Sequence, residues 1–315
     1  MRFFFYIQCI IYRLNHLFLP LKIQSNFSNN KIIENIIKIN NQSFYYPATH
    51  KNKYTLSEFT NLTLTLKDLL NKFHAPKNFI DIGAFIGLYG FIMNNLKKTK
   101  IFSFEPNKIN FNFLKKNMSK KNSTIYNIGI SDKNYSTYIS PPKTYFNKYL
   151  QSELAIKSSS MKSIHNRKNN NSELCKFSKI DYILDKHIII NSYIKIDTEG
   201  HEFEILKYLS LKKLVPKILS VELNNYYLLK RCIHPKKYLS TFFNKKLFSY
   251  YIINKNNHKL KKINPDHLIK FMVGFKFNSL KNLVKNFVRI TPCTIDLFII
   301  RKKIYKNLKI IEACS

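Results

Sequence analysis

Carboxylates gather in one short stretch of this chain. Four of the 18 acidic side chains among its 315 residues fall within eight positions: Asp197, Glu199, Glu202 and Glu204. A carboxylate beside a bound hydroxyl can take its proton while the oxygen attacks another group, which is general base catalysis. We therefore expect Asp197, Glu199 and Glu202 to be catalytic. Lys195, which precedes them, can balance part of their charge.

Glycine forms a second cluster. The chain has only 6 glycines, and three of them, Gly83, Gly87 and Gly90, lie within eight residues. Glycine accepts a positive φ and lets a backbone approach a ligand closely. The segment from Asp81 to Gly87 follows a short apolar run and precedes a stretch with helical spacing, which predicts a strand, a tight turn and a helix. Such a turn is the usual ligand site of a doubly wound sheet, and here its glycines can present backbone N–H groups to the ligand.

An acid at the end of the next strand completes this pattern. Glu105 lies 24 residues after Asp81, where an acidic side chain usually holds the ribose hydroxyls of a nucleotide-like cofactor. The turn lacks the second Gly of a dinucleotide-binding loop, and the chain has no Walker loop. S-adenosylmethionine, an adenosine without phosphates, fits better, and its ammonium group can pair with Asp81. The expected cofactor-binding residues are Asp81, Gly83, Ala84, Phe85, Gly87, Glu105 and Asn127.

The hydrophobic pattern supplies a scaffold that brings these clusters together. Short apolar runs alternate with stretches of helical period, which predicts an α/β fold with a mostly parallel, Rossmann-like sheet and helices on both faces. The expected strands are 78–83, 101–104, 124–128, 192–196 and 218–223, and the expected helices are 55–73, 86–96, 107–118 and 201–209. Two late stretches, 247–253 and 294–300, are expected to form an antiparallel pair at the sheet edge.

The carboxyl ends of parallel strands meet at one edge of a sheet, so the glycine turn and the carboxylates should face one crevice. Glu222, which ends the strand after the carboxylate cluster, is a further catalytic candidate. A divalent cation that bridges Asp197 and Glu222 to a diol is conceivable in this arrangement. The spacing of these ligands is only suggestive, so we assign no metal ligand.

The sequence around these residues resembles the FkbM-type methyltransferases. The similarity extends over roughly residues 77–225 and lies in the strings IDIGAFIGLYG, FSFEPNKINFNFLKKNM, NIGISDK, YIKIDTEGHEFEILKYL and VPKILSVELN. The most specific part is KIDTEGHE at 195–202, which matches the family pattern K-[IL]-D-x-E-G-x-E. The resemblance implies a class I methyltransferase fold with S-adenosylmethionine as methyl donor. It also implies a cofactor loop from Asp81 to Gly87 and a ribose contact at Glu105.

Two positions of the turn depart from the family. The family often has Asn where this chain has Phe85, and a small hydroxyl residue where it has Gly90. The contact with the methionine part of the donor can differ accordingly. The activity that the resemblance implies is methyl transfer to a hydroxyl of a small molecule or glycan, such as the precursor of a surface saccharide.

The remaining chain divides around this domain. Residues 1–54 are expected to be an N-terminal helical extension and 55–315 the methyltransferase domain, with a polar insertion at about 140–178 and a basic insertion at about 255–291. The apolar run 3–12 is too short to cross a bilayer but would suit an interfacial helix on an anionic membrane. The five scattered cysteines contain no C-x-x-C pair, which indicates neither zinc nor disulfides and favours a reducing, cytoplasmic location.

The charge of the chain raises two competing interpretations. Its 53 Lys and Arg give a net charge of +35, which is typical of proteins that bind polyanions, so an RNA methyltransferase is an alternative. Three features argue against it. The basic residues are almost all Lys and are spread along the chain. The segment after the fourth strand reads DTEG in place of the N/D/S-P-P-aromatic tetrad of base methyltransferases, and an acidic cleft would repel phosphate. A second alternative is a non-catalytic binding protein on the same scaffold, with Phe85 and Gly90 as signs of lost activity. The survival of both clusters in this chain argues against it.

Overall fold

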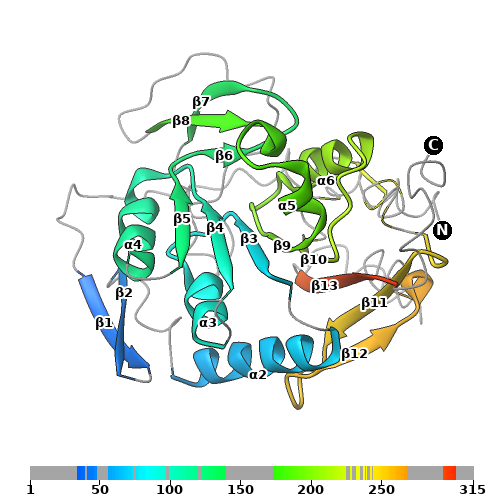
Figure 1. The fold of residues 1–315 in the computed structure, drawn as a ribbon, viewed down its shortest axis with the longest axis horizontal. Coiled ribbons are helices and arrows are strands. Elements are labelled where there is room, and N and C mark those ends of the chain that lie inside the picture. Colours follow the sequence, from blue (N-terminus) through cyan, green and yellow to red (C-terminus); the bar gives the residue numbers. More distant parts are fainter. Residues whose placement is uncertain are drawn as a thin grey trace, which may run out of the picture.

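The computed structural model describes most of the chain between residues 34 and 302. The described ranges are 34–39, 41–47, 56–73, 76–96, 99–119, 122–139, 173–224, 244–267 and 294–302, with a few positions between 225 and 243. These residues form one large sheet and two small ones, with helices on both faces of the large sheet (Figure 1).

The large sheet has eight strands. In chain order they are β3 (Asn78–Ile82), β4 (Lys100–Phe104), β5 (Ser123–Tyr126), β9 (Ser192–Ile196), β10 (Ile218–Asn224), β11 (Phe248–Ile253), β12 (Leu260–Ile263) and β13 (Thr294–Arg301). Their order across the sheet is β12-β11-β13-β10-β9-β3-β4-β5. The strands from β10 to β5 pair in parallel, β13 lies antiparallel between β10 and β11, and β12 is antiparallel at the edge. The predicted fold class is confirmed.

The strand order places a crevice beside β3. The chain builds β3, β4 and β5 outward in one direction and then returns to build β9 and β10 on the other side of β3. At such a reversal the connections after neighbouring strands leave in opposite directions, and ligands bind between them. Both sequence clusters follow strands at this point, since the glycine turn follows β3 and the carboxylates follow β9.

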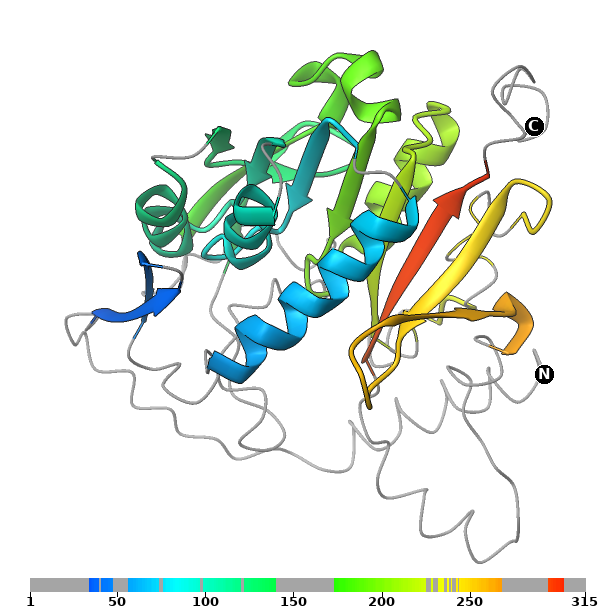
Figure 2. The same ribbon diagram turned by 60° about the horizontal axis from the view of Figure 1, so that its bottom comes forward.

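The two faces of the sheet are covered by different helices. One face packs against α2 (Leu56–Phe73), α3 (Leu88–Leu96) and α4 (Lys108–Met118), and α2 runs across it in Figure 2. The opposite face packs against α5 (Lys186–Ile190) and α6 (Glu202–Leu211). Alternation along β3 sends Phe79 to the first core and Ile80 and Ile82 to the second. Asp81 therefore shares the face of Phe79, towards α2 and α3.

The described part of the N-terminal extension is a hairpin. Residues Glu34–Ile39 and Gln42–Pro47 form the antiparallel strands β1 and β2, so the predicted helical extension is wrong for this stretch. The hairpin is attached to α4 because the Asn117 amide accepts a hydrogen bond from Tyr45 N at 2.7 Å and donates one to Tyr45 O at 2.9 Å. Phe44 is fully buried in the core beneath it. A paired backbone and a buried aromatic ring fix an extended conformation that the local sequence pattern does not reveal.

A three-stranded sheet lies beside the crevice. It consists of β6 (Gly129–Ile130), β7 (Tyr135–Ile139) and β8 (Glu173–Ser178), in the order β6-β8-β7. Strand β8 falls in the predicted polar insertion, which is therefore wrong for its last six residues. Cys175 and Phe177 are buried on β8, and a side chain at Gly129 would collide with the Phe177 ring. This packing makes β8 part of the domain.

Several predicted segments extend beyond the described residues. Residues 1–33, with the apolar run 3–12, and all of 140–172 and 268–293 lie outside them. The described start of the predicted basic insertion contributes the edge strand β12. Among the described helices, none is long and apolar enough to cross a membrane.

Candidate active site

A cavity of about 520 Å³ opens at the crevice. Its walls come from the turn after β3, the segments that follow β4 and β9, the small sheet, and the start of β13. The volume lies in the usual range for a pocket that holds a small-molecule ligand. The cavity thus joins the two sequence clusters in one space.

The glycine turn and the carboxylate cluster touch through their backbones. A Cβ atom at Gly83 would lie 1.9 Å from the carbonyl oxygen of Asp197, and Gly83 has a φ of +77°. Asp197 N in turn donates a hydrogen bond to Ile82 O at 3.0 Å. Glycine is required at position 83 because any side chain would push the end of β9 away from the end of β3.

The N–H groups of the turn are used within the protein. Gly83 N and Ala84 N both donate to Phe104 O at 3.0 Å, and Gly87 N donates to Ala84 O at 2.8 Å. The expectation that these glycines present their N–H groups to a ligand is therefore wrong. Their contribution is the shape of the turn, in which Gly83, Ala84 and Phe85 line the cavity and Gly87 packs against α4.

Phe85 has an unusual backbone conformation. Its φ of +53° lies in the left-handed region, which is rare for a bulky residue and which Asn tolerates much better. The FkbM-type sequences that this turn resembles often carry Asn at the same place. The turn thus keeps a shape suited to Asn, and the Phe85 side chain adds an aromatic wall to the cavity.

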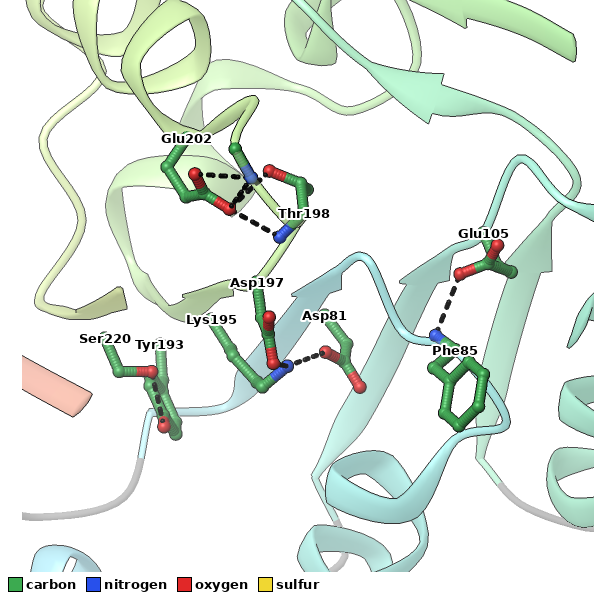
Figure 3. A network of polar contacts seen from close by, with 10 residues as sticks. Asp81, Phe85, Glu105, Tyr193, Lys195, Asp197, Thr198, Glu202 and Ser220 are labelled. Atoms are coloured by element: carbon green, nitrogen blue, oxygen red, sulfur yellow. Dashed lines mark hydrogen bonds and ion pairs between the residues drawn. The ribbon is translucent and has the colours of Figure 1, made fainter. Parts of the chain in front are cut away.

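Glu105 is held in place beside this turn. Its carboxylate is 6% exposed and accepts hydrogen bonds from Phe85 N and Asn107 N, each at 2.9 Å (Figure 3 shows the first of these). Burial raises the pKa of Glu105 to about 7, and these hydrogen bonds offset only part of the effect. Oε1 also accepts a longer hydrogen bond from Asn110 Nδ2 at 3.4 Å, whereas Oε2 keeps a lone pair that can accept a hydroxyl of a ribose. Asn127, by contrast, donates to the carbonyls of Glu105 and Pro106 and does not line the cavity, so it positions the segment.

A buried lysine joins the two clusters electrostatically. Lys195 Nζ lies 3.7 Å from an Asp81 oxygen and 3.1 Å from an Asp197 oxygen, and it sits 4.5 Å from the centre of the Tyr89 ring (Figure 3 shows the two carboxylates). Burial lowers the pKa of Lys195, but Asp197 and Asp81 outweigh it and hold the pKa above its ordinary value. Lys195 therefore stays charged and keeps the Asp197 carboxylate at the cavity wall.

Asp81 has a different place from the predicted one. Its side chain is 1% exposed and does not line the cavity. Burial raises the pKa of Asp81, and Lys195 opposes that rise. Asp81 is thus the buried counter-ion of Lys195, in place of the predicted contact with the amine of a ligand.

Glu202 shapes the loop after β9. Its carboxylate accepts hydrogen bonds from Thr198 N at 2.8 Å, from the Thr198 hydroxyl at 3.0 Å and from Gly200 N at 3.0 Å (Figure 3). The side chain is 2% exposed and does not line the cavity. These bonds hold a turn in which Glu199 and Gly200 both have positive φ. The geometry assigns Glu202 to the loop, in place of the predicted direct role in catalysis.

The other predicted acids do come together. Oxygens of Asp197, Glu199 and Glu222 lie within 4.8 Å of one another, and Asp197 and Glu199 line the cavity. This spacing would admit a divalent cation, but exposed carboxylates commonly approach so closely without one, so no metal ligand is assigned.

The sequence interpretation missed two side chains at this wall. Tyr89, on α3, covers Lys195, and Asp296, on β13, lines the cavity. Tyr89 gives no signal because it fits the apolar period of its helix. Asp296 does give one, since it is the only acid between residues 267 and 311 of a Lys-rich stretch.

The sheet has the strand order of class I methyltransferases, with an antiparallel strand beside β10. The acid after β4, Glu105, also contacts the turn after β3 as it does in that class. The model of the methyltransferase FkbM domain matches residues 81–238, which is half of the chain. The chain therefore belongs to the FkbM methyltransferase family.

Comparison with curated proteins gives no match. Among solved structures, the chain is similar to the plantazolicin methyltransferase BpumL in complex with SAH, at 10% identity and a TM-score of 0.42 over 81% of this chain and 88% of that one. It is also similar to the bifunctional kinase-methyltransferase WbdD, at 9% identity and a TM-score of 0.38 over 79% of this chain and 40% of that one. A third similar structure is P. horikoshii TYW2 in complex with MeSAdo, at 11% identity and a TM-score of 0.35 over 85% of this chain and 72% of that one. Likeness at this level carries no information on substrate.

Proposed function

We propose that this protein transfers a methyl group from S-adenosylmethionine to a hydroxyl of a small molecule or glycan. The observation that supports this most directly is one cavity that runs from Glu105 to Asp197 across the turn at Gly83. A methyl transfer needs donor and acceptor in line and in contact, and a continuous cavity allows that arrangement.

The end of the cavity near Glu105 suits the nucleoside part of the donor. Glu105 offers its buried carboxylate to a ribose hydroxyl, and Ile130 and Phe177 offer apolar surface to the adenine. S-adenosylmethionine, when bound, supplies a methyl group that its positively charged sulfur activates. The residues of this chain then need only hold the donor and exclude water around it.

The other end of the cavity suits a hydroxyl acceptor. Lys195 fixes the Asp197 carboxylate at the wall, where it can accept a hydrogen bond from the acceptor hydroxyl, and Glu199 lies beside it. Acidic side chains outnumber the basic Lys195 in the cavity wall, although the chain as a whole carries a net charge of +35. A polyphosphate would be repelled there. This charge pattern favours a neutral acceptor over RNA.

Transfer of a labelled methyl group tests this proposal. The protein is incubated with methyl-labelled S-adenosylmethionine and a cell extract, which is then separated into glycan, lipid, small-molecule and RNA fractions. We expect label in a glycan or small-molecule fraction, bound as a methyl ether that survives alkali, whereas a methyl ester would release methanol. Label in RNA, with binding that weakens steeply as salt rises, would overturn the proposal.

Substitution of Asp197 tests the acceptor end separately. We expect Asp197→Asn to leave donor affinity nearly unchanged and to lower kcat/KM for methyl transfer by about 10²-fold or more, because the acceptor loses its charged hydrogen-bond partner. Asp185→Asn is the matched control, since Asp185 is exposed at the start of α5 and does not line the cavity. A variant at Asp197 that is as active as this control would remove Asp197 from the site.

A further inference from the structure

Asp296 is a carboxylate of the cavity wall whose role in the site has not yet been assigned. It lies near the start of β13, directly opposite Glu222 of β10 in the antiparallel register, and its side chain is partly buried. Asp296 lines the same cavity as Asp197, whereas Glu222 does not. Asp296 is thus placed at the end of the cavity that the proposed function assigns to the acceptor.

The two aspartates of this wall differ in their partners. Asp197 forms an ion pair with the Lys195 ammonium at 3.1 Å, which holds its carboxylate in place. Within the described part of the chain, the Asp296 carboxylate makes no hydrogen bond or ion pair. The Asp197 carboxylate is therefore already engaged by a cation, whereas the Asp296 carboxylate is open to a hydroxyl of a bound acceptor.

We propose that Asp296 is the general base of the methyl transfer and that Asp197 orients the acceptor. This inference rests on the proposed function, since it needs a hydroxyl acceptor. The acceptor oxygen forms a bond to the methyl carbon while the bond from that carbon to sulfur breaks and its electron pair stays on sulfur. The hydroxyl proton passes to the Asp296 carboxylate and from there to solvent.

The electrostatic surroundings of Asp296 support this assignment. The pKa of Asp296 is raised to about 6: burial contributes most of the rise, Asp197 adds to it and Lys195 opposes it. A base with such a pKa is ionised at neutral pH yet holds a proton more firmly than an ordinary carboxylate, which is the compromise that general base catalysis favours. Tyr89 of α3 and His258, between β11 and β12, also line the cavity, and Tyr89 is close enough to Asp296 to interact with it electrostatically.

The experiment compares Asp296→Asn with Asp197→Asn and with the control Asp185→Asn. The acceptor is the extract fraction that the wild-type protein labels, with S-adenosylmethionine at saturation. We expect Asp296→Asn to lower kcat by about 10²-fold or more without weakening donor binding. We also expect the wild type to lose rate as the pH falls through about 6. Asp197→Asn should show the same loss at a lower pH, because it lacks the charge that raises the pKa of Asp296, and Asp296→Asn should lack this dependence.

Chemical rescue distinguishes a base from a merely structural residue. In Asp296→Ala, added formate should restore part of the rate in proportion to its concentration, because it supplies the missing carboxylate. Retention of more than half of the wild-type kcat in Asp296→Asn would overturn the assignment. The assignment would also be overturned if Asp296→Ala lost activity that formate did not restore and Asp296→Asn kept the pH dependence of the wild type. If the wild-type protein labels no hydroxyl compound at all, the proposed function fails instead.

Discussion

Gly83→Ala should damage both the fold and the site, because it separates the ends of β3 and β9. The new methyl group would lie 1.9 Å from the Asp197 carbonyl oxygen and 2.8 Å from its carbonyl carbon, and both atoms belong to the backbone. They cannot move aside as the end of a flexible side chain would. The conformation of Gly83, with φ at +77°, costs any other residue a further penalty.

The size of the effect follows from these two contributions. A left-handed conformation costs an alanine about 1–2 kcal/mol, and overpacking of a rigid interior typically costs about 1–3 kcal/mol. We therefore expect the free energy of unfolding of Gly83→Ala to fall by about 2–5 kcal/mol. The displaced Asp197 should also reduce methyl transfer in whatever fraction stays folded.

Gly90→Ala is the matched control. Gly90 lies within α3, and a Cβ there would meet the flexible end of Met118 at 3.1 Å and Ile101 at 3.5 Å. Alanine favours a helix over glycine by about 1 kcal/mol, which roughly offsets the tight contact. Urea denaturation of both variants provides the measurement. If Gly83→Ala is as stable as Gly90→Ala, the contact between the turn and the Asp197 backbone is not as described.

Two further predictions concern the buried charges. Glu105 has a pKa of about 7 in the folded protein and 4.5 as its ordinary value, so its ionisation should lower the stability by up to about 3 kcal/mol as the pH rises from below 4.5 through 7. Urea denaturation across this pH range should show the decline in wild type and a flatter profile in Glu105→Gln; equal profiles would contradict the burial argument. Lys195→Met should cost about 3–5 kcal/mol, because it leaves Asp81 buried without its counter-ion. Adding Asp81→Asn should recover part of that loss, and a double variant no more stable than Lys195→Met would show that the two side chains are not coupled.

The sequence predicts the central sheet well because the pattern there is local. Strands β3, β4, β9 and β10 are short apolar runs that alternate with helices, and this alternation leaves few other arrangements. Gly83 and Glu105 are found in the same way, since their roles depend on their position at the end of a strand. The helix expected at 107–118 is likewise found as α4, and Asn107 caps it by accepting a hydrogen bond from Asn110 N.

Features that depend on contacts between distant segments cannot be predicted from the local sequence pattern. Strand β8 has only two buried side chains, Cys175 and Phe177, in a stretch whose composition resembles a polar insertion. The pairing of Asp81 with Lys195 depends on the face to which each strand turns its side chains. Asp296 reaches the cavity because β13 is inserted beside β10, and no local pattern reports that neighbour.

Calorimetric titration of S-adenosylmethionine into the protein tests the central claim most directly. We predict one donor molecule bound per chain, with affinity lost in Glu105→Ala and retained in Asp197→Asn, because Glu105 lies at the donor end of the cavity and Asp197 at the acceptor end. Absence of binding to the folded protein, or binding that survives Glu105→Ala unchanged, would contradict the claim that this cavity holds the methyl donor.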